Sequence, residues 1–230
     1  MNTRRLMIIS RLKGKKLKQP IEKKIHRIIK EMLPNVSYRN KIKYYPWNID
    51  YEIDGDYTCS KHSCLINDAK IYLTFSTPLT FVYKKIMKYF SYSENKVQWG
   101  IEKIISYELE FNDGLYYLGN YSLLTSHLYE GFYYDVLPLD PQFEVFINHM
   151  IKRKADAFGF TISPFRIEVI PETIEVKSGI TVKGNIYRGW KSGIRILDTD
   201  PETRSFIIMA GLSDFSELGY GFILENKVNI

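Results

Sequence analysis

The sequence contains few of the residues that hold small secreted or membrane-spanning proteins together. Cys59 and Cys64 are the only cysteines among 230 residues, so we do not expect a disulfide to hold the fold. No apolar run approaches the length needed to cross a bilayer. The apolar stretch of residues 6–9, which follows a basic N-terminus, is too short for a secretory signal. These absences predict a cytoplasmic protein without a membrane partner.

Residues that bind metals are also scarce. The two cysteines flank one histidine, His62, in the six residues from Cys59 to Cys64. A structural zinc site takes four ligands, usually in two close pairs, and the sequence offers no second pair. We therefore expect a polar hairpin tip here, with no metal and no other cofactor.

Length and composition set the size of the core. A chain of 230 residues with 45% hydrophobic content can bury one large core or two small ones. We predict two domains: an N-terminal domain over residues 1–112 and a C-terminal domain over residues 113–230.

The excess of positive over negative charge is concentrated in the first fifth of the chain. Residues 1–45 contain fourteen Lys and Arg against Glu22 and Glu31, a balance of +12. The net charge of the whole chain is +6, so the remainder carries −6. A polyanion suits such a segment, and nucleic acid suits it better than an anionic membrane because no strongly hydrophobic anchor accompanies the charge. A solvated basic face without a partner is the alternative.

Apolar spacing in the first half predicts alternating strands and helices. We expect strands over residues 5–12, 41–53, 70–76 and 97–110, with a basic turn at 13–16 and a second turn at 54–56. One helix begins at Gln19-Pro20 and ends at Pro34, and another covers residues 78–90. The apolar residues of the first helix recur at helical period: Ile21, Ile25, Ile28, Ile29, Met32 and Leu33.

The same order of elements recurs in the second half. We expect strands over residues 121–129, 165–176, 179–187 and 221–228, and helices over 140–157 and 201–210. Strand, helix, strand, strand, helix, strand is the ferredoxin-like unit. The sequence therefore predicts an α+β protein of two tandem ferredoxin-like (RRM-like) domains, each βαββαβ.

A glycine-bracketed loop follows the last predicted helix. Gly211 ends an apolar run, and Gly219 and Gly221 lead into Phe222. Glycines let a backbone take positive φ or approach a ligand closely, and arrays of bare N–H groups hold phosphates. A hairpin with a bulge is the alternative.

This pattern resembles the C-terminal glycine-rich loop of the repeat-associated (RAMP) superfamily, in particular the CRISPR-associated endoribonucleases that cut precursor CRISPR RNA. The resemblance covers most of the chain and is most specific over residues 180–222, where a basic, glycine-containing hairpin precedes a helix begun by Asp200-Pro201 and then the loop. Ser213 stands where the family usually has a further glycine, and serine can still bond a phosphate.

The resemblance implies an activity and partners. Enzymes of this family cut CRISPR repeat RNA without metal: the 2′-hydroxyl attacks phosphorus and leaves a 2′,3′-cyclic phosphate and a 5′-hydroxyl. The alternatives are a catalytically inactive repeat-RNA-binding relative and a subunit of a CRISPR effector complex. The implied partner is precursor crRNA, and association with other CRISPR-associated proteins or in a homodimer stays open.

His26 is the candidate general base for such a reaction, because it lies in the basic segment on the first helix. We expect the neighbouring cations to lower its pKa. Lys30, one turn on, is the candidate to neutralise the phosphorane, and Tyr38 is a candidate beyond the helix. Family members carry their histidine on this helix or in the loop after it, and residues 35–45 contain none. An ordinary histidine at a surface edge is the alternative for His26, and we expect His127 and His149 to be structural.

The candidate RNA-binding residues lie near the C-terminus. Tyr187 and Trp190 could stack on bases, while cations contact phosphates. A basic exposed hairpin without RNA is the alternative. The predicted RNA-binding residues are Lys183, Arg188, Lys191, Arg195, Gly211, Ser213, Gly219 and Gly221.

Overall fold

The computed structural model describes residues 2–17, 21–32, 45, 47–59, 63–109, 114–127 and 133–225. The chain divides into two compact units. Unit 1 comprises Met1–Lys43 and Ile49–Leu109, and unit 2 comprises Tyr44–Asn48 and Glu110–Ile230. Unit 2 thus includes a five-residue segment that lies, in sequence, inside unit 1.

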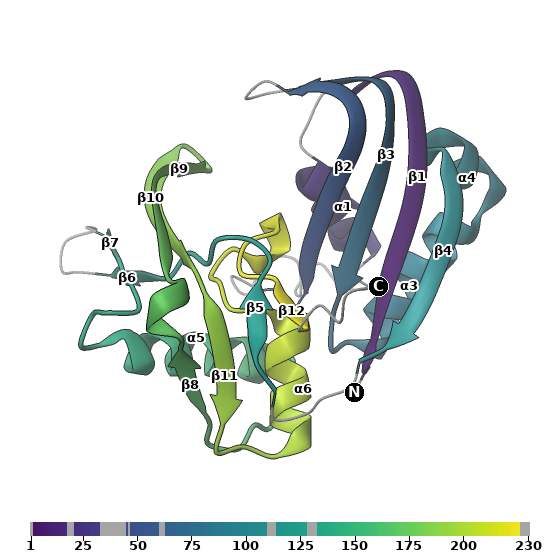
Figure 1. Cartoon of the computed structure of the whole chain (residues 1–230). Helices are drawn as coiled ribbons and strands as arrows, with labels where there is room; N and C mark the ends of the chain where they lie inside the picture. The colour runs from purple at the N-terminus through teal and green to yellow at the C-terminus, as the bar shows by residue number, and fades with distance from the viewer. Residues whose placement is uncertain are drawn as a thin grey trace. The chain divides into compact units, whose positions relative to one another are not determined.

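Unit 1 is a four-stranded antiparallel sheet with helices on one face (Figure 1). The strand order is β2-β3-β1-β4, and β1 pairs antiparallel with both β3 and β4. This arrangement is a ferredoxin-like unit. Its elements are β1 (Arg4–Leu17), α1 (Ile21–Met32), β2 (Asn48–Cys59), β3 (Cys64–Ser76), α3 (Thr80–Ser91), α4 (Ser93–Trp99) and β4 (Ile101–Glu108).

The core of unit 1 follows from the two apolar periodicities. Alternate residues of β1, Leu6, Ile8 and Leu12, are buried beneath the helices, as the period of two for a strand requires. Of the apolar stripe predicted for α1, Ile25, Ile28 and Ile29 are buried as expected. The side chains of Ile21, Met32 and Leu33 lie outside the described part of the chain.

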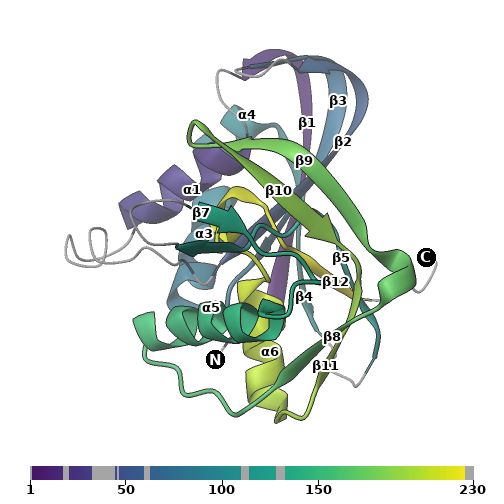
Figure 2. The same cartoon turned by 90° about the vertical axis from the view of Figure 1, so that its left-hand side faces the viewer.

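Unit 2 repeats the arrangement with two inserted hairpins. Its sheet has the order β12-β5-β11-β8, which is again ferredoxin-like, so the predicted fold class is confirmed. Hairpin β9–β10 lies between β8 and β11 in sequence and projects away from the sheet (Figure 1 and Figure 2). The elements are β5 (Tyr116–Leu118), β6 (Thr125–His127), β7 (Tyr133–Asp135), α5 (Phe143–Ala157), β8 (Arg166–Val169), η2 (Pro171–Thr173), β9 (Glu175–Val182), β10 (Asn185–Lys191), β11 (Gly193–Leu197), α6 (Pro201–Ala210), η3 (Ser216–Leu218) and β12 (Ile223–Glu225).

Strands β1 and β2 of unit 1 continue through the turns that were predicted to end them. The expected basic turn at residues 13–16 is part of β1, where Lys13 pairs with Asp68 of β3 and their charged atoms lie 3.2 Å apart. The expected turn at residues 54–56 is likewise part of β2. Both predictions are wrong, because polar residues in these strands face solvent and opposite charges on neighbouring strands support the pairing.

Further predicted elements differ from the structure. The predicted strand over 165–176 is interrupted by η2 and divided between β8 and β9. Lys183 and Gly184 both have positive φ and form a two-residue hairpin turn, so the predicted strand over 179–187 is divided between β9 and β10. The third strand of the unit 2 sheet is β11, and its first is β5 rather than residues 121–129. Residues 97–99 belong to α4, which ends at the left-handed Gly100, and β4 begins at Ile101.

Cys64, at the start of β3, is disulfide-bonded, which corrects the expectation that no disulfide would hold the fold.

None of the helices in the described part of the chain is long and apolar enough to cross a membrane.

Candidate functional site

Helix α1 carries two of the three predicted catalytic residues. The side chains of His26 and Lys30 are both partly exposed, and their spacing of four residues places them on the same face of the helix. Arg27 is exposed, with Nε 4.0 Å from a carboxylate oxygen of Glu31. Tyr38 lies outside the described residues.

Cations crowd around α1. The ammonium of Lys24 lies 4.3 Å from the centre of the Trp99 ring, a cation–π contact to α4. Burial lowers the pKa of Lys24, and the charges of Arg27 and Lys15 lower it further. The repulsion among these groups makes the neighbourhood of α1 favourable for an anion.

The glycine-rich loop of unit 2, residues 211–222, needs its glycines for close packing within the protein. Gly211, Gly219 and Gly221 all have positive φ. A Cβ at position 221 would lie 2.4 Å from the carbonyl oxygen of Leu212, and one at 211 would lie 2.1 Å from Nδ2 of Asn48. The backbone N–H of Leu212 donates to the carbonyl of Gly221 at 2.9 Å, so the two ends of the loop are held together.

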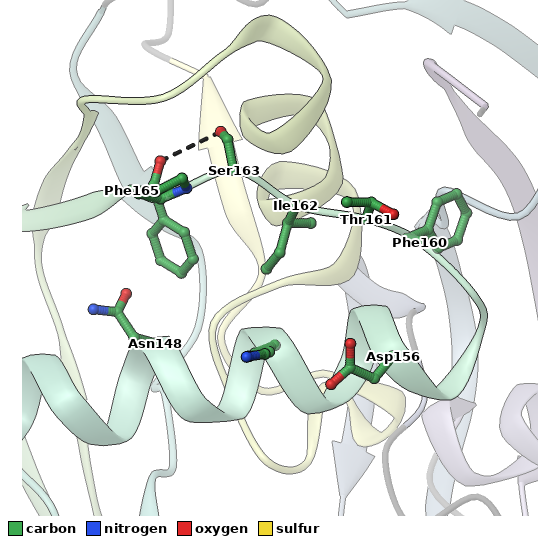
Figure 3. A pocket seen from close by; sticks show the side chains of 9 residues that line it. Asn148, Asp156, Phe160, Thr161, Ile162, Ser163 and Phe165 are labelled. Atoms are coloured by element: carbon green, nitrogen blue, oxygen red, sulfur yellow. Dashed lines mark hydrogen bonds between the residues drawn. The ribbon is translucent and has the colours of Figure 1, made fainter.

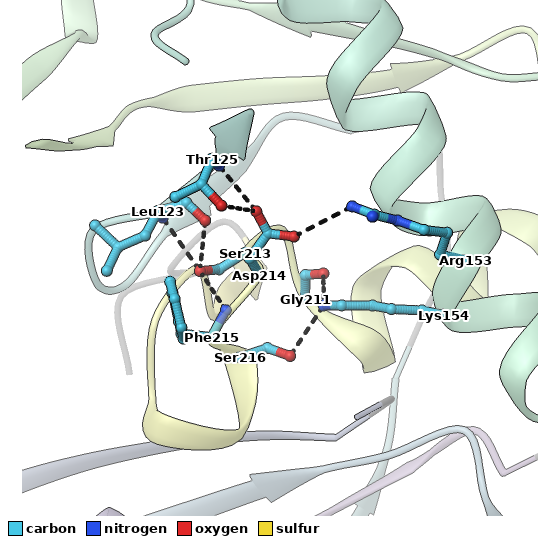
Figure 4. A network of polar contacts seen from close by, with 9 residues as sticks. All are labelled: Leu123, Thr125, Arg153, Lys154, Gly211, Ser213, Asp214, Phe215 and Ser216. Atoms are coloured by element: carbon cyan, nitrogen blue, oxygen red, sulfur yellow. Dashed lines mark hydrogen bonds and ion pairs between the residues drawn. The ribbon is translucent and has the colours of Figure 1, made fainter. Parts of the chain in front are cut away.

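Lys154 of α5 fixes the start of this loop (Figure 4). Its side chain is only 1% exposed. The Nζ donates to the carbonyl oxygens of Ala210 and Gly211 at 3.0 and 2.9 Å, and to Oγ of Ser216 at 2.9 Å. Because the first two acceptors lie at the C-terminal end of α6, the ammonium also faces the negative end of the helix dipole.

Ser213 and Asp214 attach the loop to the chain segment after β5 (Figure 4). The hydroxyl of Ser213 donates to the carbonyl of Leu123 and accepts from the N–H of Leu123, each at 3.1 Å. Asp214 Oδ2 accepts from the N–H of Thr125 at 2.9 Å, and Oδ1 lies 3.8 Å from the Arg153 guanidinium. Burial raises the pKa of Asp214 despite these contacts.

The loop therefore bonds mainly to its own protein. Ser213 is fully buried, and the N–H groups of Leu212, Asp214, Phe215, Gly219 and Gly221 all donate within unit 2. In this conformation these five N–H groups are occupied by acceptors of the protein itself. A role of Gly211, Ser213, Gly219 or Gly221 in RNA binding stays a prediction, and their role in shaping the loop is what the contacts support.

Hairpin β9–β10 packs against this loop. Leu123, Ile180, Val182 and Leu218 form a buried cluster between them. The rings of Tyr187 and Phe215 lie 5.2 Å apart. The ammonium of Lys183, at the hairpin turn, lies 5.5 Å from the Phe215 ring. The fold thus brings the predicted basic hairpin and the glycine-rich loop together in unit 2.

The other predicted cations lie further along the hairpin and on β11. Arg188 has an exposed side chain, and its backbone N–H donates to Asp135. Lys191 Nζ lies 3.4 Å from the Glu175 carboxylate. Arg195 is on β11, where it pairs with Glu168 at 2.9 Å.

The aromatic residues available for stacking differ from those expected. Trp190 is fully buried, with its ring 5.3 Å from that of Phe143, so it cannot stack on a base in this conformation. Tyr121, which the sequence did not single out, is partly exposed between two ammonium groups: Lys177 at 5.5 Å and Lys191 at 5.7 Å from its ring. No local pattern marks Tyr121, because both lysines come from the distant hairpin.

A separate pocket of about 480 Å³ lies on α5, on the side of the segment 160–165 (Figure 3). The helix contributes Asn148, Lys152 and Asp156 at intervals of four residues, and the facing segment contributes mainly apolar side chains. None of the predicted site residues lines it. Among the residues with described positions, no group of three or more His, Cys, Asp and Glu side chains could hold a metal.

No family model and no curated protein sequence matches the chain. Solved structures do match in fold. The product of a Cas6-related gene from Pyrococcus furiosus is 16% identical with a TM-score of 0.72, over 98% of this chain and 99% of that one. A RAMP protein that binds different RNA substrates is 15% identical with a TM-score of 0.69, over 96% and 98% of the two chains. A CRISPR-associated protein Cas6 is 16% identical with a TM-score of 0.62, over 97% and 99%.

The fold class is therefore that of the RAMP proteins, two tandem ferredoxin-like units over nearly the whole chain. Among these proteins the structural neighbours are Cas6 proteins, in agreement with the resemblance seen in the glycine-rich loop. At these identities the likeness establishes the fold.

Proposed function

We propose that this protein binds CRISPR repeat RNA and cuts it to mature crRNA without a metal ion. The observation that carries the proposal is that the glycine-rich loop packs against the basic hairpin β9–β10 within unit 2. The fold around them is shared with Cas6 proteins. Lys183, Arg188 and Lys191 supply cations for phosphates, and Tyr121 supplies an aromatic ring.

In the proposed reaction His26 accepts the proton of the attacking 2′-hydroxyl. The oxygen attacks the adjacent phosphorus, the bond to the 5′-oxygen breaks, and that oxygen takes a proton from a general acid that we do not assign. Lys30, one turn from His26 on α1, offsets the charge on the phosphorane. The products are a 2′,3′-cyclic phosphate and a 5′-hydroxyl.

Incubation of the purified protein with the repeat RNA of its own genome, in EDTA, tests the proposal. We expect cleavage at one position with a cyclic phosphate on the upstream product. If the RNA is bound but stays intact, the protein is a binder without this activity. If the RNA is neither bound nor cut, the proposal is wrong.

A catalytically inactive repeat-RNA-binding protein, alone or as a subunit of an effector complex, is the second candidate. The absence of histidine between Asn35 and Tyr45 favours it, because the resembled enzymes often place their catalytic histidine there. Co-purification with a multisubunit particle, together with intact bound RNA, would distinguish this candidate from the enzyme.

A further inference from the structure

The outer face of α3 in unit 1 combines cations with exposed aromatic rings. Val82, Tyr83, Ile86 and Phe90 are buried toward the sheet. On the opposite side the exposed residues of α3 and its C-cap follow helical spacing. Besides Thr80, Met87 and Ser91, they include Phe81, Lys84, Lys85, Lys88 and Tyr92, and we call these last five the α3 face.

Two aromatic side chains mark the two ends of this face. Phe81 is 40% exposed and Tyr92 53%, and eleven residues separate them, which is about 16 Å along a helix. Lys84, Lys85 and Lys88 lie between these rings in sequence. The ammonium of Lys88 lies 5.8 Å from the Tyr92 ring, so a cation and a π-face are presented together.

The charge on this face is of one sign. The sequence of α3 contains three lysines and no acidic residue. The neighbouring α4 adds Lys96 and Glu94, which cancel. A face of lysines flanked by aromatic rings complements a single-stranded nucleic acid, in which phosphates take the ammonium groups and bases stack on the rings.

Helix α3 also contacts the helix of the candidate base, α1. Lys24 of α1 reaches the Trp99 ring of α4 at 4.3 Å, and α4 directly follows the α3 face in the chain. Residues of α1 and α3 are in contact within unit 1. Unit 1 therefore carries cations on two helices that contact each other, α1 with His26 and α3.

We propose that the α3 face is a second RNA-binding surface, which holds a single-stranded segment next to the repeat. This inference rests on the proposed function, because it names where further RNA is held on the same protein. An anionic lipid surface and an acidic protein fit the lysines but make no use of the stacking that Phe81 and Tyr92 offer.

The test compares two RNAs, the repeat alone and the repeat with a single-stranded spacer extension. The variant is Lys84→Gln/Lys85→Gln/Lys88→Gln, and a charge-matched control is Lys70→Gln/Lys103→Gln/Lys152→Gln, whose lysines lie on β3, β4 and α5. For the parent and the control we expect the extension to tighten binding. For the α3 variant we expect the extended RNA to bind no more tightly than the repeat alone, while the affinity for the repeat alone is unchanged.

Salt dependence gives a second measure. Each single-strand phosphate contact contributes about 0.7 to the log–log slope, so loss of three contacts should reduce the slope for the extended RNA by about 2. A second variant, Phe81→Ala/Tyr92→Ala, should lose part of the added affinity for the extended RNA. Its dependence of affinity on salt concentration should equal that of the parent, because stacking is not ionic.

Three outcomes would overturn the inference. If parent and α3 variant bind the extended RNA equally, the α3 face does not hold RNA, although the proposed function stands. If the α3 variant instead loses binding to vesicles of anionic phospholipid, the surface is a membrane contact. If the parent binds neither RNA, the proposed function and this inference fall together.

Discussion

Nζ of Lys154 lies 2.9 Å from the carbonyl oxygen of Gly211, so a buried ammonium on α5 is bonded to the first residue of the glycine-rich loop. The same group donates to Ala210 and Ser216. Ser216 in turn donates from its hydroxyl to the carbonyl of Tyr45 at 3.2 Å. The conformation of the loop thus depends on a charge that lies 57 residues earlier in the chain.

Replacement of Lys154 tests this dependence. Lys154→Met keeps the length of the side chain and removes the donors, so the acceptors of Ala210 and Gly211 lose a partner, at a cost of about 1–3 kcal/mol each. We expect a lower free energy of unfolding and weaker RNA binding at temperatures where the variant is folded. Lys152→Met, on the exposed side of the same helix, should change neither quantity.

Substitution of Gly221 tests the close approach in the loop. Gly221→Ala should destabilise the protein more than Gly184→Ala, although both residues have positive φ. The conformational cost is about 1–2 kcal/mol for either, but only at position 221 would the new Cβ meet a backbone oxygen, at 2.4 Å. Equal losses in chemical denaturation would show that the close contact relaxes freely.

The carboxyl group of Asp214 should make stability depend on pH. Because burial raises its pKa in the folded protein, its favourable contribution is complete below the unfolded pKa of about 3.9 and is lost as the pH rises through the folded value. Asp214→Asn removes this loss. We expect the free energy of unfolding of this variant, relative to the parent, to increase from about pH 4 toward neutrality.

His26→Ala tests the proposed base. The variant should bind repeat RNA nearly as well as the parent, because the proposed phosphate contacts lie on other residues. It should cut the RNA roughly 10²- to 10⁴-fold more slowly, the usual contribution of a positioned acid–base group. Single-turnover cleavage and a binding assay on the same RNA separate the two effects. A variant that cuts at the parental rate would transfer the role to other residues, with Tyr38 first among them.

Periodicity predicted well what depends on neighbours in sequence. The described part of the α1 stripe, Ile25, Ile28 and Ile29, is buried as the pattern predicts. Helix α6 begins at Asp200-Pro201 as predicted, and the Asp200 side chain accepts from the N–H of Thr203 at 2.7 Å. The alternating pattern over residues 179–187 predicted one strand and missed the turn at Lys183-Gly184. A two-residue hairpin turn is too short to disturb such a pattern.

The interior of the candidate site could not be predicted in the same way. The buried residues of α5 include Phe143, Ile147, Met150 and Ile151, and their spacing places Lys154 on the same buried face. A lysine at such a position is the one sequence feature that indicates a buried charge here. Ser213 bonds to Leu123, 90 residues away, and no local pattern reveals such a partner. The sequence therefore indicates which residues are unusual, while the contacts that give them a role come from the fold.

The short segment Tyr44–Asn48 constrains how this protein can be cut into pieces. A fragment that begins at residue 110 lacks the carbonyl of Tyr45, which accepts from Ser216, and the amide of Asn48, which donates to Tyr220 at 3.4 Å. Such a fragment would leave Ser216 and the loop carbonyl of Tyr220 without these bonds. Two separately expressed halves should form these hydrogen bonds only when they are mixed. Unit 2 is therefore better studied by mixing the two fragments than by expressing residues 110–230 alone.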